Sequence, residues 1–108
     1  MASLSSDRYQ PFPHQIDEKI SAVPSTGTDL TTTDSRVWQI SVCNTTAGAL
    51  TFTMADKQGT PRYAIKAASI EANTTYVVTW PEGIPFSGGI NWSGSGSGLE
   101  ASIIGCYK

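Results

Sequence analysis

Serine-hydrolase chemistry in this chain would have to use His14, which is its one histidine. A Ser-His-Asp hydrolase needs an imidazole held beside its nucleophile. His14 follows Pro13 in a proline-containing segment without helical or strand periodicity. A catalytic group on such a segment loses the positioning that supplies most of its effect, so we expect no catalytic triad.

The two cysteines, Cys43 and Cys106, lie far apart in the chain, each without a histidine or second cysteine nearby. Transition-metal sites need clustered ligands at short spacing, so we expect no metal and no cofactor. The N-terminus lacks the basic start and apolar block of a secretory signal, which favours a reducing cytosol and free thiols. We expect both cysteines to be partly buried on neighbouring strands, where a disulfide remains geometrically open.

The carboxylates and the glycine-rich stretch are weak candidates for chemistry. Glu71, Glu82 and Glu100 stand alone, and Asp17 adjoins Glu18 in the N-terminal segment. A two-carboxylate glycosidase would need the fold to bring such residues together, so solvated charges are the preferred interpretation. The stretch 94–98 lacks the lysine and the helix that a phosphate-binding loop requires. Its Gly/Ser composition predicts a flexible linker within a hairpin. We therefore expect a protein that is not an enzyme.

Exposed aromatic rings are the remaining candidates for a binding site. Trp38 and Trp92 alternate with apolar neighbours and are expected in the core. Trp80 stands next to Pro81, where the inward face of a strand can change. We therefore name Trp80 and Tyr63 as possible glycan-stacking residues.

Composition restricts the classes of partner. The chain has 108 residues, of which 39% are hydrophobic and 15% charged, and its net charge is -2. This length suits one domain. The seven Lys and Arg residues are scattered, which argues against nucleic-acid binding. Apolar runs such as 76–78 are far shorter than the roughly 20 residues that cross a bilayer, so we expect no membrane partner.

Residues 1–35 predict an extended N-terminal arm, because this segment has three prolines, a Ser/Thr/Gly/Asp-rich end and no sustained period. Only 15–23 could form a short helix, and coil is favoured there unless a partner orders it. The body, 36–108, changes to the period-two alternation of strands.

The predicted strands of the body are 36–43, 50–54, 62–67, 76–80, 90–92 and 99–107. The first two are expected to pair as an antiparallel hairpin, and the prolines at 81 and 85 are expected to end the fourth. The fold class is therefore all-β: a small antiparallel β-sandwich, or a small barrel, of six to seven strands with an extended N-terminal arm. We favour the sandwich.

The predicted core follows from the alternation, which leaves Trp80 and Ile104 ambiguous. It consists of Trp38, Ile40, Val42, Leu50, Phe52, Met54, Ile65, Ile70, Tyr76, Val78, Ile90, Trp92, Leu99, Ala101 and Ile103.

Three segments of the body carry a family resemblance: 37–46 (VWQISVCNTT), 70–78 (IEANTTYVV) and 81–90 (PEGIPFSGGI). In the first a strand ends in an Asn-Thr-Thr turn, in the second a strand follows an Ala-Asn-Thr-Thr entry, and in the third a Pro-Glu-Gly segment leads to a Gly-Gly-Ile strand. This arrangement resembles the small virion structural proteins of tailed bacteriophages. These motifs contain no catalytic signature.

The resemblance implies a capsid decoration or cement protein, made in the host cytoplasm and located in the virion. Its partners would be other virion proteins, above all the major capsid protein, and further copies of the chain in a homo-oligomer. An extended arm of this length could reach on the order of 100 Å at roughly 3.3 Å per residue. We expect Tyr9, Phe12 and Ile16 to dock on a neighbour as apolar anchors. The alternatives are a tail, neck or fibre-base component, or a carbohydrate-binding β-sandwich module.

Overall fold

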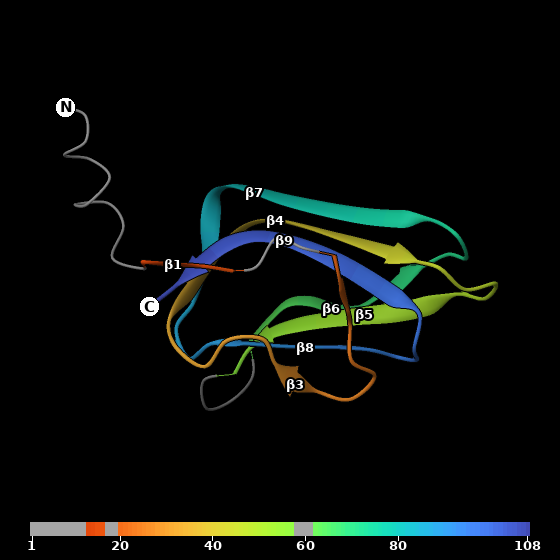
Figure 1. The fold of residues 1–108 in the computed structure, drawn as a ribbon, viewed down its shortest axis with the longest axis horizontal. Coiled ribbons are helices and arrows are strands. Elements are labelled where there is room, and N and C mark those ends of the chain that lie inside the picture. Colours follow the sequence, from red (N-terminus) through yellow and green to blue (C-terminus); the bar gives the residue numbers. More distant parts are fainter. Residues whose placement is uncertain (1–12, 17–19, 58–61) are drawn as a thin grey trace.

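The computed structural model describes residues 13–16, 20–57 and 62–108, and in these ranges the chain forms strands and no helix. Two antiparallel sheets pack face to face as layers of a sandwich (Figure 1). Sheet A contains, in spatial order, β1 (His14–Gln15) with β2 (Ser21–Ala22), then β9 (Leu99–Tyr107), β4 (Ser35–Asn44) and β7 (Thr75–Phe86). Sheet B contains β3 (Thr28–Asp29), β8 (Ile90–Gly94), β5 (Leu50–Asp56) and β6 (Arg62–Ile70). The all-β sandwich is therefore confirmed.

The strand pairs are nested along the chain. At the centre β5 pairs with β6, outside them β4 pairs with β7, then β3 with β8, and finally β1 and β2 with β9. Two further pairings complete the sheets. Strand β4 also pairs with β9 in sheet A, and β5 also pairs with β8 in sheet B. A long antiparallel ribbon folded over in this way has the connectivity of a jelly roll.

The predicted hairpin between the first two strands of the body is wrong, because β4 and β5 lie in different sheets. Asn44, which is fully buried, is the last residue of β4, and after it the chain crosses from sheet A to sheet B. Its amide nitrogen Nδ2 donates to the carbonyl oxygens of Gly48 and Ile70, both at 2.9 Å. The stretch 94–98 is likewise no hairpin linker, since it leads from β8 in sheet B to β9 in sheet A.

The N-terminal segment needs a correction as well. Its described residues are extended, but they lie on the sandwich and contribute β1, β2 and β3 to its two sheets. Two-residue strands are too short to produce a period-two pattern, which is why the sequence indicated an arm apart from the body. Val23 is 3% exposed and belongs to the core. The part of the segment that the structure describes is therefore part of the domain.

A β-bulge in β4 changes which side chains of this strand face inward. Val37 lies opposite Gly105 and Gln39 opposite Ile104, so Trp38 is an extra residue on β4. Val37 is consequently fully buried together with Ile40, whereas Trp38 is only half-buried. The prediction that Trp38 shares the inward face with Ile40 is wrong for this reason.

Strand β7 runs through both prolines to Phe86, where the sequence predicted an end near Trp80. This is possible because β7 is an edge strand, on which a missing N–H can point away from the sheet. Val37 and Gln39 are two residues apart on β4, whereas their partners Ile84 and Thr79 are five residues apart on β7. The extra residues of β7 form a bulge around Pro81, and β7 pairs with β4 again from Ile84 to Phe86.

Most of the predicted core is confirmed. Buried members are Ile40, Val42, Phe52, Met54, Ile65, Ile70, Ile90, Trp92, Leu99, Ala101 and Ile103, and partly buried members packed against them are Leu50, Tyr76 and Val78. The sequence did not indicate Ile16, Val23, Val37 and Phe86, which the structure adds.

Candidate functional site

The carboxylates considered for catalysis do not form one site in the described part of the chain: Glu71 follows β6, Glu82 lies on β7 and Glu100 on β9. Asp17 and Glu18 lie outside the described residues. His14 lies on β1, where its ring faces Tyr107 with the centroids 5.2 Å apart and the planes tilted by 30°. Among the described residues, no group of three or more His, Cys, Asp or Glu side chains is arranged to hold a metal ion. In the same part of the chain, no helix has the length and apolar character needed to cross a membrane.

The two cysteines lie on adjacent strands, as expected, but at opposite ends of them. Cys43 on β4 is opposite Glu100, whereas Cys106 on β9 is opposite Arg36. Seven residues of β4 separate these positions, or about 23 Å at ~3.3 Å per residue, whereas a disulfide needs Cα atoms within about 7 Å. Both cysteines are free thiols. Burial raises the pKa of the Cys106 thiol, and the nearby Arg36 charge opposes this only in part.

Asp56, at the end of β5, is a buried carboxylate, with 6% of its surface exposed. One carboxylate oxygen accepts hydrogen bonds from the backbone N–H of Ser87 at 2.9 Å and from its hydroxyl at 3.0 Å. The other oxygen accepts from the backbone N–H of Gly88 at 3.0 Å. Asp56 thus fixes the turn by which the chain passes from β7 in sheet A to β8 in sheet B.

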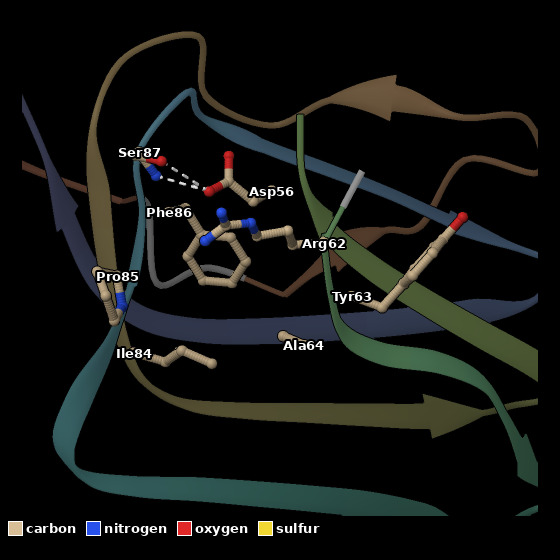
Figure 2. A pocket seen from close by; sticks show the side chains of 8 residues that line it. All are labelled: Asp56, Arg62, Tyr63, Ala64, Ile84, Pro85, Phe86 and Ser87. Atoms are coloured by element: carbon tan, nitrogen blue, oxygen red, sulfur yellow. Dashed lines mark hydrogen bonds between the residues drawn. The ribbon is translucent and has the colours of Figure 1, made fainter. Parts of the chain in front are cut away.

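A small pocket of about 300 Å³ opens beside Asp56 (Figure 2). Arg62, which pairs with Asp56 across β5 and β6, extends into this pocket, while the Tyr63 ring points away from the carboxylate. Phe86 and Ile84 supply an apolar wall. Because donors of the turn already occupy both oxygens of Asp56, this carboxylate is placed to hold structure rather than to transfer protons.

Tyr63, one of the two predicted glycan-stacking residues, is 49% exposed and lies at the outer face of sheet B. It borders a second cavity of about 390 Å³ that also has Thr53, Asn91 and Ser93 in its wall. Lys66 Nζ lies 4.9 Å from the centre of the Tyr63 ring, within reach of a cation–π contact.

An ion pair at the edge of sheet B lies near this cavity. Lys57 Nζ is 2.7 Å from Asp29 Oδ2, and Asn91 donates to Asp29 Oδ1 at 3.0 Å. These two hydrogen bonds, with that of Lys57 the larger influence, lower the pKa of the Asp29 carboxyl below 3.8. The polar groups at this end of the cavity are thus largely engaged with one another.

Trp80 does not join Tyr63 in one site. It is half-buried, packs against the core, and borders a separate cavity of about 330 Å³ with Pro81, Glu82 and Gly83. Trp80 belongs to sheet A and Tyr63 to sheet B. The structure therefore leaves Tyr63 as the exposed ring of the predicted pair.

Of the three predicted arm anchors, Ile16 is placed by the structure and is buried within its own domain. It is 4% exposed, and its backbone N–H donates to the carbonyl oxygen of Gly105 at 2.9 Å. Ile16 is therefore unavailable as an anchor on a neighbour, and this prediction is corrected. Tyr9 and Phe12 lie outside the described residues.

The outer face of sheet A is a weakly charged surface that sequence analysis did not single out. Alternation along β9, β4 and β7 directs nine side chains away from the core. They form three rows across the sheet: Glu100, Cys43 and Thr75; Ser102, Ser41 and Val77; Ile104, Gln39 and Thr79. We call these nine residues the sheet A face, on which Glu100 is the one charged residue.

Apolar side chains are exposed on the sheet A face. Val77 is 55% and Ile104 46% exposed. Ile20, which is 73% exposed, borders a shallow cavity of about 230 Å³ on the same face. Period-two alternation predicts which of these strand residues face outward, but only the strand order shows that Val77 and Ile104 lie on one face, on either side of β4.

No protein-family model, curated protein or solved structure matches this chain.

Proposed function

We propose that this chain is a non-enzymatic structural protein of a tailed-bacteriophage virion, in the role of a capsid decoration or cement protein. It binds the major capsid protein of the shell and further copies of itself. The resemblance of segments 37–46, 70–78 and 81–90 to such proteins motivates the phage assignment. A tail, neck or fibre-base position is the alternative within the virion.

The observation that carries the assembly role is the sheet A face. Val77 and Ile104 expose apolar surface among small polar side chains, with one carboxylate on the face. Interface centres are depleted in charge, and a broad, weakly charged face suits protein contact better than contact with nucleic acid. The hydrogen bonds to both oxygens of Asp56 support a non-enzymatic role, because they commit a buried carboxylate to a turn.

Jelly-roll connectivity supports the proposal by analogy only. Capsid domains and lectin domains both use it, so the fold agrees with the proposal and with a carbohydrate-binding module alike.

Particle binding tests the proposed role. The purified chain is mixed with virions of the phage that encodes it, prepared without the corresponding gene, and the mixture is pelleted through a sucrose cushion. We expect wild-type protein in the pellet at a fixed copy number, and a loss of about tenfold or more in affinity for Ile104→Lys, which replaces exposed apolar surface of the sheet A face with a charge. Ser69→Lys, an exposed position on sheet B, serves as the matched control and should bind like wild type. Wild-type protein that stays in the supernatant would overturn the proposal, and the copy number separates a shell position from a tail or neck position.

Carbohydrate binding is the second candidate, and the exposed Tyr63 ring favours it, because it borders a cavity that also has Thr53, Asn91 and Ser93 in its wall. Under this alternative, binding to a glycan array would be lost in Tyr63→Ala and retained in Trp80→Phe. Absence of glycan binding by the wild-type chain would remove this candidate.

A further inference from the structure

The edges of the two sheets differ in how they are protected from pairing with another chain. In sheet A, β1 and β2 are two residues each, and in sheet B so is β3. Edge strand β6 carries Arg62 and Lys66 and has two register shifts against β5. Short length, charge and bulges are the usual means of preventing edge-to-edge association.

Strand β7 is protected over only part of its length. Its second half contains Pro81 and Pro85 and the bulge against β4. Its first half, 75–79, has the sequence TYVVT, with no charge, proline, glycine or register shift. In the described part of the chain β7 pairs with β4 alone, and Figure 1 shows it along the outer margin of sheet A.

The register with β4 shows which backbone groups of this segment are available. The N–H of Asn44 donates to the carbonyl oxygen of Thr74 at 2.9 Å. In an antiparallel pair, hydrogen-bonded positions alternate, so Tyr76 and Val78 direct their backbone groups toward β4. Thr75, Val77 and Thr79 therefore direct their N–H and C=O groups away from the sheet.

The same segment is self-complementary when it is read in the antiparallel direction. With Val77 opposite Val77 of a second copy, Thr75 meets Thr79, and Tyr76 meets Val78. Each outward N–H and C=O group then meets such a group of the other copy. Thr–Thr and aromatic–β-branched pairs are favourable cross-strand neighbours. Centring the two-fold axis on Tyr76 or Val78 would leave an outward residue unpaired, so this register is preferred.

We infer that two copies of this chain associate through 75–79 of β7, antiparallel about a two-fold axis at Val77, and so extend sheet A into one continuous sheet across both molecules. The contact is isologous and closed, which limits association through this edge to a dimer. This inference rests on the proposed function, which includes binding between copies of the chain, and it specifies the contact through which two copies bind.

Measurement of molar mass tests the inference on the purified full-length chain. We expect light scattering after size exclusion to give twice the chain mass of 11.5 kDa. Val77→Lys places like charges opposite each other and should raise the dissociation constant of the dimer about tenfold or more. Ser69→Lys is the matched control, because it adds the same charge at an exposed position of sheet B, outside both the β7 edge and the sheet A face, and it should remain dimeric. A monomeric wild type, or a dimer unaffected by Val77→Lys, would overturn the inference.

Cross-linking gives a second readout that does not depend on weakening the contact. Opposed residues of a hydrogen-bonded pair have Cα atoms about 5.5 Å apart, within the range of a disulfide. Val77→Cys, made together with Cys43→Ser, should therefore form a covalent dimer on mild oxidation, and Ile104→Cys in the same background should not. Equal cross-linking of both variants would contradict the edge contact. Because neither measurement uses phage particles, the dimer and the proposed virion role can fail separately.

Discussion

The side chain of Ile16 fills the space that Gly105 leaves free on β9. A Cβ atom at residue 105 would lie 3.0 Å from Ile16 Cδ1 and 2.6 Å from the carbonyl oxygen of Arg36. The backbone N–H of Ile16 donates to the carbonyl oxygen of Gly105 at 2.9 Å. The first described segment and the last strand of the chain are therefore fitted to each other.

Gly105→Ala should destabilise the fold, since the added methyl group meets the backbone of β4, which cannot rotate away as a side chain would. Overpacking of this kind costs about 1–3 kcal/mol of the free energy of unfolding. Urea denaturation followed by tryptophan fluorescence measures the change. Glu100→Ala, at an exposed position on the same strand, is the control, and equal midpoints for the two variants would contradict the close packing at Gly105.

Ile16→Ala should cost about 2–4 kcal/mol of the free energy of unfolding, because it leaves a cavity in the core. Ile20→Ala removes the same atoms from a side chain that is 73% exposed, and we expect a change within about 0.5 kcal/mol. The comparison uses the same denaturation experiment. If the two substitutions had the same effect, Ile16 would not be a core residue.

Asp56→Ala should destabilise the fold by about 2–4 kcal/mol, because the backbone N–H groups of Ser87 and Gly88 lose a charged acceptor. Asp56→Asn keeps one acceptor oxygen and should cost less. Hydrogen exchange of the two N–H groups reports on the same turn and should accelerate in both variants. Unchanged exchange in Asp56→Ala would show that the carboxylate does not fix the turn.

The pKa of Asp29 should lie below 3.8, since Lys57 and Asn91 hydrogen-bond to its ionised form. A lowered pKa means that the stabilisation from this carboxylate is present above pH 3.8 and is lost as the pH falls through the pKa of the folded state. A carboxyl-carbon NMR titration measures this pKa. Lys57→Gln should raise the pKa of Asp29 toward 3.8. The same titration curve in both proteins would show that the ion pair does not form in solution.

The sequence sufficed for the fold class and most of the core because the alternation around Val42, Phe52 and Ile103 extends over whole strands. It did not reveal the bulge at Trp38, because inserting one residue in β4 depends on the register of β9. It also did not show that β4 and β5 lie in different sheets, since a short Asn-containing connection suits a hairpin and a crossover equally well.

The candidate surfaces were less accessible to prediction. Tyr63 could be named from its type and position, and it is exposed. Val77 and Ile104 were visible as apolar residues, but they share a face only because β4 lies between their strands. Ile16 was interpreted as an anchor on a neighbour because an isolated apolar residue in a proline-containing segment does not indicate which surface it meets.

The presence of the chain in purified virions tests the assembly role most directly. Particles banded twice in a density gradient would be analysed by quantitative mass spectrometry, with the major capsid protein as the internal standard. The proposed role predicts that the chain bands with the particles at a fixed ratio to the major capsid protein and is stripped from them by denaturant. A chain found wholly in the fractions free of particles would contradict it.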